Sequence, residues 1–412
     1  LERKKNFKGY YRITKEVKNI HQKIFDLLMW KYRDRSSSFH FRANRITPDF
    51  KRALFGPIKR IHLRLIKWML LKPLILFRRL LYEFEPFFSS YLNRLKASIK
   101  PNKVLSSVID SNEYDLIILP TSAYAVEGID IAWICEDIKT KSLFLVDNWD
   151  NLSSKTVMWK KPSHIGVWGE QSKQHAINIQ NINEQDISLL GTPRFIKYFE
   201  CRNDSLESHF PFKYILFVGT ALNFDEEFIL SQIETVLEKN KQVWGDVKVI
   251  YRPHPWRQNN IKVKDSYGKN IITDPQILLS GNDKSVKNQP KLDYYPSLIK
   301  NAEFVMGGLT SMLIESLVFY KPFLAFVHKD KRYVSNMRNA WKFFEHFRGL
   351  SSTEGVFFSK DINDIDKSMI ECWKKRESLD SKKIESDRDW FLHEDGSGYQ
   401  QRLMLCIEEA LR

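Results

Sequence analysis

The chain has 412 residues, of which 43% are hydrophobic and 13% aromatic, so it can form two globular units and is too apolar to be disordered throughout. Its net charge of +15 is local, because the first 100 residues carry 25 Lys and Arg against 7 Asp and Glu. This excess indicates a polyanionic partner: an anionic membrane, a nucleic acid or a charged polymer. The four cysteines lie far apart without zinc-ligand spacing, which argues against a disulfide framework and indicates reduced thiols in a cytosolic protein.

Residues 1–100 form the first predicted region, which is basic and mainly helical. Apolar residues recur at helical spacing over residues 15–30 and again over residues 51–82. The second of these helices carries the heavier basic load. We expect this region to direct the protein to an anionic surface and to take no part in chemistry.

Three basic side chains, Arg60, Arg64 and Lys67, fall on one face of the second helix, and Pro73 is expected to kink or end it. The apolar stretch 61–82 contains five basic residues and is not expected to span a bilayer. Such a helix can lie on an anionic membrane with Trp and Leu in the interface. A packing helix with solvated charges is the alternative, and both interpretations remain open at this point.

Strand-like runs alternate with helical segments through residues 101–205 and again through residues 206–412. This alternation predicts parallel sheets with covered faces, and hence an α/β fold of two Rossmann-like domains. The first domain is expected to take the acceptor and the second the nucleotide donor. Strands are expected at residues 114–120, 142–147, 164–168, 214–219, 247–251, 304–307 and 323–326, and helices at residues 226–239 and 310–320. Ligands bind at the carboxyl ends of such strands, so chemistry is sought there.

A loop rich in basic residues and proline follows one of these strands at residues 251–257, which read Tyr-Arg-Pro-His-Pro-Trp-Arg. The two prolines restrict the backbone, so Arg252, His254 and Arg257 are presented with little freedom left to lose. A guanidinium can fork onto phosphate oxygens and an imidazole can donate to one. The loop therefore predicts phosphate binding, with a purely structural turn as the alternative.

A second motif, at residues 306–316, combines a strand end, two glycines and a helix that opens with Thr310 and Ser311. Glycines let a ligand approach the backbone, and a helix N-terminus supplies free N–H groups to phosphate. Glu315, one turn further on, can accept hydrogen bonds from ribose hydroxyls. An ordinary helix start is the alternative. The residues assigned to the nucleotide are Gly219, Thr220, Arg252, His254, Arg257, Gly308, Thr310, Ser311 and Glu315.

On these motifs, the chain from about residue 213 onwards resembles the nucleotide-binding domain of GT-B glycosyltransferases. More closely, it resembles the group containing the teichoic-acid CDP-glycerol glycerophosphotransferases. Shared features are the Arg-Pro-His-Pro loop, a Ser/Thr-opened helix ending in a Lys-Pro pair at residues 321–322, and an Asp-Gly segment at residues 393–398. Bacterial polysialyltransferases and Kdo transferases use a similar His-Pro motif and Ser/Thr motif for CMP.

The resemblance implies roles for single residues. His254 and Ser311 or Thr310 would touch the donor phosphates, and Glu315 would face the ribose. The donor would be CMP-, CDP- or UDP-linked, without an obligatory metal.

Two carboxylates, Asp147 and Asp150, follow a predicted strand, and such a group can take the proton from an attacking hydroxyl. In the glycerophosphotransferases a similar position carries Trp-His-Gly followed by Lys, with the His as the proposed base. Here Trp149, Asp150, Asn151 and Lys155 fall at the matching spacing, so Asp150 would replace that His and Asp147 is the second candidate. This departure favours a sugar donor over a polyol phosphate. An Asx-rich turn capping a helix is the alternative.

The remaining polar features carry less information. Glu170 follows a predicted strand and, with Asn151 and Lys155, is assigned to the acceptor side. The Asp-x-Asp pairs at residues 364–366 and 387–389 lie in charged helical stretches and are interpreted as solvated, so no metal site is expected. Four histidines show no partner pattern, namely His164, His175, His328 and His346.

Together these features predict an inverting, metal-independent glycosyltransferase that moves a sugar from a nucleotide-activated donor to a surface-polysaccharide or lipid-linked acceptor. It would act in the cytoplasm, peripherally at the inner face of the cytoplasmic membrane. Transfer of a polyol phosphate from a CDP-linked donor, as in teichoic-acid synthesis, is the first alternative. Nucleic-acid binding through the basic region is the second, and it is not expected because the charge avoids both α/β domains.

Overall fold

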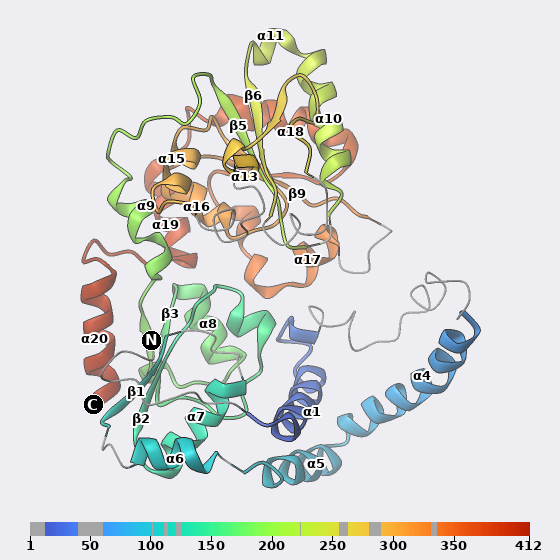
Figure 1. Cartoon of the computed structure of the whole chain (residues 1–412), viewed down its shortest axis with the longest axis vertical. Coiled ribbons are helices and arrows are strands. Elements are labelled where there is room, and N and C mark those ends of the chain that lie inside the picture. Colours follow the sequence, from blue (N-terminus) through green and yellow to red (C-terminus); the bar gives the residue numbers. More distant parts are fainter. Residues whose placement is uncertain are drawn as a thin grey trace. The chain divides into compact units, whose positions relative to one another are not determined.

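The computed structural model forms two compact units (Figure 1). The first unit comprises Leu1–Gly191, Phe344–His346 and Tyr399–Arg412, and the second comprises Thr192–Phe343 and Phe347–Gly398. The chain therefore changes unit after Gly191, earlier than the expected boundary at residue 205, and its last helix returns to the first unit. The structure describes residues 13–39, 61–100, 102–110, 114–120, 126–222, 224–254, 263–279, 290–330 and 336–412.

The described part of the basic region is helical, as the sequence predicts: α1 spans Lys15–Lys31, α4 spans Ile61–Glu83 and α5 spans Glu85–Ala97. Helix α4 continues through Pro73. Of the two expected effects of this proline, ending the helix is therefore wrong, and kinking it stays a prediction. Among the described residues, no helix combines the length and apolarity needed to cross a bilayer. The three helices meet in an apolar cluster that includes Ile24, Leu27, Leu28, Met29, Tyr82, Phe88 and Leu95.

The first unit contains a parallel sheet with strands in chain order, β1-β2-β3-β4. Its strands are β1 (Leu116–Leu119), β2 (Lys141–Leu145), β3 (His164–Val167) and β4 (Ile187–Leu189). Its other helices include α6 (Lys103–Asp110), α7 (Val126–Asp137), α8 (Glu170–Asn178) and α20 (Tyr399–Leu411). Cys406 and Ala410 of α20 pack on Leu143, Leu145 and Leu190, which explains why the C-terminal helix belongs to this unit (Figure 1).

The second unit contains six parallel strands in the order β10-β9-β8-β5-β6-β7, which is the 3-2-1-4-5-6 order of a Rossmann fold read from its other edge. The strand order reverses between β5 and β8, where such folds bind nucleotides. The short strands β7 and β10 were not predicted. The six strands are β5 (Tyr214–Val218), β6 (Lys248–Arg252), β7 (Ile271–Thr273), β8 (Val305–Gly307), β9 (Phe323–Phe326) and β10 (Val356–Ser359).

Among the helices of this unit, α10 has the predicted bounds, and its N-cap Asp225 accepts a hydrogen bond from Phe228 N at 3.0 Å. Helix α16 is shorter than predicted. The helices are α9 (Ile196–Glu200), α10 (Glu226–Lys239), α11 (Lys241–Trp244), α13 (Pro275–Leu279), α15 (Tyr294–Lys300), α16 (Met312–Val318), α17 (Met337–Phe343), α18 (Ile365–Lys375) and α19 (Ser381–Phe391). The predicted α/β class with two Rossmann-like domains is confirmed, and all four cysteines are buried and free.

Candidate nucleotide cavity and candidate base

A cavity of about 610 Å³ lies in the second unit, where the segments after β5, β6 and β8 converge. It therefore occupies the switch point at which a Rossmann sheet binds its ligand. Six of the nine residues assigned to the nucleotide line it, although they come from three separate stretches of sequence. The lining comprises Arg194, Phe195, Tyr198, Gly219, Arg252, Pro253, His254, Pro290, Lys291, Leu292, Tyr295, Thr310, Ser311, Met312 and Glu315.

Arg252 is held firmly at the wall of this cavity. Its side chain is only 4% exposed, Nη1 forms an ion pair with the fully buried Asp274, and Nε donates to Tyr295 Oη at 2.9 Å. Tyr294 donates to the other oxygen of Asp274. Burial opposes the charged guanidinium, but Tyr295 and Asp274 outweigh it and raise the pKa of Arg252. Nη2 is buried and has no hydrogen-bond partner within the described part of the chain.

His254 is half-buried, and the position of its backbone explains why residue 219 is a glycine. A Cβ on Gly219 would lie 2.4 Å from His254 N, so only glycine lets the end of β5 approach the loop after β6 this closely. Gly219 N also donates to Arg252 O at 2.8 Å. The glycine thus serves to place the basic loop at the cavity.

The lining also contains Thr310, Ser311 and Glu315 of the second motif. Glu315 accepts a hydrogen bond from Tyr198 Oη at 2.6 Å and lies 3.8 Å from Arg194 Nη2. Burial raises the pKa of Glu315, against the opposing effects of Arg194 and of hydrogen bonds from Tyr198 and Ser311. The carboxyl is therefore already engaged by donors of the protein itself.

Two assigned residues that the structure describes, Thr220 and Gly308, do not line the cavity. Thr220 is buried and donates through Oγ1 to Leu309 O at 3.0 Å. It therefore links the segment after β5 to the segment after β8. A Cβ on Gly308 would meet Met337 Cε at 2.7 Å, so this glycine makes room for a protein side chain instead of a ligand. Arg257 lies outside the described residues.

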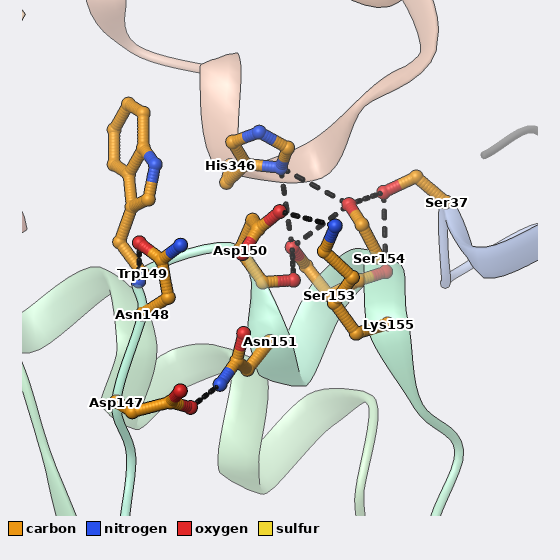
Figure 2. A network of polar contacts seen from close by, with 10 residues as sticks. All are labelled: Ser37, Asp147, Asn148, Trp149, Asp150, Asn151, Ser153, Ser154, Lys155 and His346. Carbon is orange, nitrogen blue, oxygen red and sulfur yellow. Dashed lines mark hydrogen bonds and ion pairs between the residues drawn. The ribbon is translucent and has the colours of Figure 1, made fainter. Parts of the chain in front are cut away.

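In the first unit, the two candidate carboxylates lie just beyond β2, at a five-residue π-helical turn, η2 (Asn151–Lys155), shown in Figure 2. Asp147 accepts a hydrogen bond from Asn151 Nδ2. Asp150 forms an ion pair with Lys155 at 3.3 Å, and their side chains are 14% and 24% exposed. Single π-helical turns are rare and occur frequently at functional sites. The turn orders both carboxylates and leaves part of Asp150 open to solvent.

His346, for which no partner was expected, joins this turn (Figure 2), so that expectation is wrong. Its Nδ1 lies 3.0 Å from Ser154 Oγ, which in turn lies 2.8 Å from Ser37 Oγ. Its ring meets that of Trp149 edge-on, with centroids 5.2 Å apart. Burial and then the charge of Lys155 lower the pKa of His346 to about 3, so the imidazole is neutral. The contact is invisible in the sequence because the partners are nearly 200 residues apart.

Glu170 follows β3 and opens α8, and it accepts a hydrogen bond from Gln174 at 2.8 Å. Its assignment to the acceptor side stays a prediction. Arg194 was missed, although its place five residues after the end of β4 could have suggested it. Asp274 was also missed, and no motif in the sequence marks it as part of the site. Among the described residues, no group of three or more His, Cys, Asp or Glu side chains gathers as metal ligands would.

The chain contains two Rossmann-like units, and the second has a cavity at its switch point. This is the domain organisation of the GT-B fold class. Similar solved structures include UDP-GlcNAc 2-epimerase from Methanocaldococcus jannaschii, with 12% identity and a TM-score of 0.45 over 74% of this chain and 80% of that one. A glycotransferase of kitacinnamycin is also similar, with 10% identity and a TM-score of 0.46 over 75% and 79% of the two chains.

A variant of the wall teichoic acid polymerase TagF has 15% identity and a TM-score of 0.39, and the match covers 64% of this chain. The chain spans 60% of the length of that polymerase structure. No protein-family model and no curated protein matches the sequence. Similarity at this level of sequence identity does not identify the substrate of this chain.

Proposed function

We propose that this protein is an inverting, metal-independent glycosyltransferase that uses a nucleotide-activated sugar. The observation that carries the proposal is the cavity of the second unit, which gathers Arg252, His254, Thr310, Ser311 and Glu315 at the switch point of a Rossmann sheet. Cationic, imidazole and hydroxyl donors in this lining suit phosphate oxygens, and the carboxyl of Glu315 suits hydroxyl groups.

In the proposed reaction an acceptor hydroxyl attacks the anomeric carbon of the donor. Its proton passes to Asp150, the bond from the anomeric carbon to the phosphate oxygen breaks, and the electron pair remains on the departing phosphate. His254 and Arg252 would stabilise the charge that develops on that oxygen. Asp150 is suited to the base because its side chain is partly exposed and because the ion pair with Lys155 at 3.3 Å orients its carboxylate.

We propose that the acceptor is presented at an anionic membrane surface, to which α4 attaches the protein. Large apolar side chains of α4 are exposed at intervals of three and four residues, the spacing of one helical stripe. Leu70 is 65% exposed and Leu80 is 69% exposed. The side chains of Arg64 and Lys67, and all of Arg60, lie outside what the structure describes. The stripe includes Ile66, Leu70, Leu74, Phe77 and Leu80, with Phe84 just beyond the helix.

The proposal is tested with a panel of free nucleotides and nucleotide sugars. A ligand at saturating excess should raise the free energy of unfolding by roughly 2 to 4 kcal/mol. We expect CMP, CDP or UDP, or their sugars, to do so, and we expect the matching sugar to appear on a glycan or lipid acceptor. A product containing a polyol phosphate would replace this function with phosphotransfer, and no stabilisation by any nucleotide would contradict both.

A further inference from the structure

His346 contacts the chain on both sides of Asp150, the proposed base (Figure 2). Before Asp150, the indole of Trp149 meets the imidazole edge-on at 5.2 Å. After Asp150, Ser153 Oγ and Ser154 Oγ lie 3.5 and 3.0 Å from His346 Nδ1. The imidazole therefore contacts the turn that carries the carboxylate on both sides of Asp150.

A second layer of hydrogen bonds fixes these groups in turn. Ser37 Oγ lies 2.8 Å from Ser154 Oγ, donates to Ser153 O at 3.1 Å and accepts from Glu345 N at 3.1 Å. Ser37, Ser153 and Ser154 are at most 1% exposed, so water does not compete for these bonds. Three segments distant in sequence thus meet in one buried polar network.

The segment that supplies His346 is exceptional in the fold. It follows α17, which belongs to the second unit, yet Phe344–His346 belongs to the first. Gln171 Nε2 of α8 donates to His346 O at 3.2 Å and anchors its backbone. Only three consecutive residues of this segment belong to the first unit, and they place the imidazole against a single turn. This arrangement indicates a specific role for the His346 side chain.

We infer that His346 is a positioning residue, which holds the π-helical turn so that Asp150 and Lys155 keep their relative geometry. It is not itself the base, because it is 3% exposed and its ring already contacts Ser154 and Trp149. The inference rests on the proposed function only for the role of Asp150. The order that His346 imposes on the turn can be measured without any substrate.

The test compares backbone hydrogen exchange by mass spectrometry, in the full chain, for His346→Ala, His346→Asn and the parent protein. Without the imidazole, exchange over residues 147–158 should accelerate about tenfold, while β3 and α8 keep their protection. The asparagine side-chain oxygen can replace Nδ1 as a partner for Ser154, so His346→Asn should restore most of the protection. His328→Ala is the matched control, because His328 is also buried and also contacts a serine, Ser359 Oγ at 2.8 Å.

Activity is measured separately, as release of CMP, CDP or UDP from the matching nucleotide sugars. His346→Ala should lower turnover roughly 10- to 100-fold with an unchanged KM for the donor, and His328→Ala should change neither. Unchanged exchange over residues 147–158, or an increase spread evenly over the first unit, would overturn the positioning role. Full activity of Asp150→Asn would overturn the proposed base and leave the exchange result standing, so the two failures are distinguishable.

Discussion

The ion pair between Arg252 and Asp274 offers the sharpest perturbation of the cavity wall. Their side chains are 4% and 0% exposed, so Asp274→Asn leaves a buried guanidinium without its counter-charge. Breaking one partner of such a pair costs about 3 to 5 kcal/mol. For a unit of about 200 residues, this corresponds to a fall in Tm of roughly 6 to 20 °C.

The assay is thermal unfolding followed by circular dichroism, with hydrogen exchange of β6 and β8 to assign the loss to the second unit. Adding Arg252→Met to Asp274→Asn should recover part of the stability, because it removes the uncompensated charge. Glu200→Gln is the control: it breaks the exposed pair with Lys197 at 3.4 Å and should leave Tm unchanged. A loss below about 1 kcal/mol in Asp274→Asn, the range of an exposed pair, would refute the claim that Arg252 is a fixed, buried cation.

Three further predictions concern the nucleotide, the membrane and acid stability. His254→Ala should weaken nucleotide binding by roughly 1.5 to 3 kcal/mol in calorimetry, and unchanged affinity would remove His254 from the site. Changing Leu70, Phe77 and Leu80 to Ser should abolish sedimentation with anionic liposomes, whereas Val104→Ser, which is also exposed, should not; absent binding by the parent protein would contradict the membrane proposal. His21 has no hydrogen-bond partner among the described residues, and burial lowers its pKa from 6.5 to about 4. Between pH 6.5 and pH 4, His21 binds a proton more readily in the unfolded chain than in the folded one. Its contribution to the free energy of unfolding is therefore full above pH 6.5 and is lost as the pH falls towards 4. His21→Leu should flatten the pH dependence of the free energy of unfolding measured with urea, and an unchanged pH dependence would contradict this prediction.

Much of the second unit could be predicted from the sequence because its strands and helices are marked by short, local sequence patterns. The run 214–219 is continuously apolar and became β5, and the Asp225 cap with an amphipathic repeat became α10 with its predicted bounds. Strand β7 has three residues, too few to show a period, and its place is set by pairing with β6. Short motifs after strands found six cavity residues because a parallel sheet brings such strand ends together.

Contacts between distant segments could not be predicted in the same way. His346 reaches Ser154 through an excursion of three residues into the other unit, and nothing in its local sequence marks it. Gly308 shows a related difficulty, since its neighbour Met337 decides whether the missing Cβ serves a ligand or packing. The return of α20 to the first unit likewise depends on apolar packing against β2 rather than on chain order.

The central claim, that Asp150 is the base and the nucleotide binds in the second unit, is tested most directly by Asp150→Asn with Asp147→Asn as its control. Asn keeps the shape of the carboxylate and removes its basicity. We predict that Asp150→Asn loses roughly 10² to 10⁴ in turnover while its nucleotide affinity, measured by calorimetry, equals that of the parent protein. Asp147→Asn should remain active, because Asp147 is engaged with Asn151. An active Asp150→Asn variant beside an inactive Asp147→Asn variant would exchange the two roles, and activity in both would contradict a base in this turn.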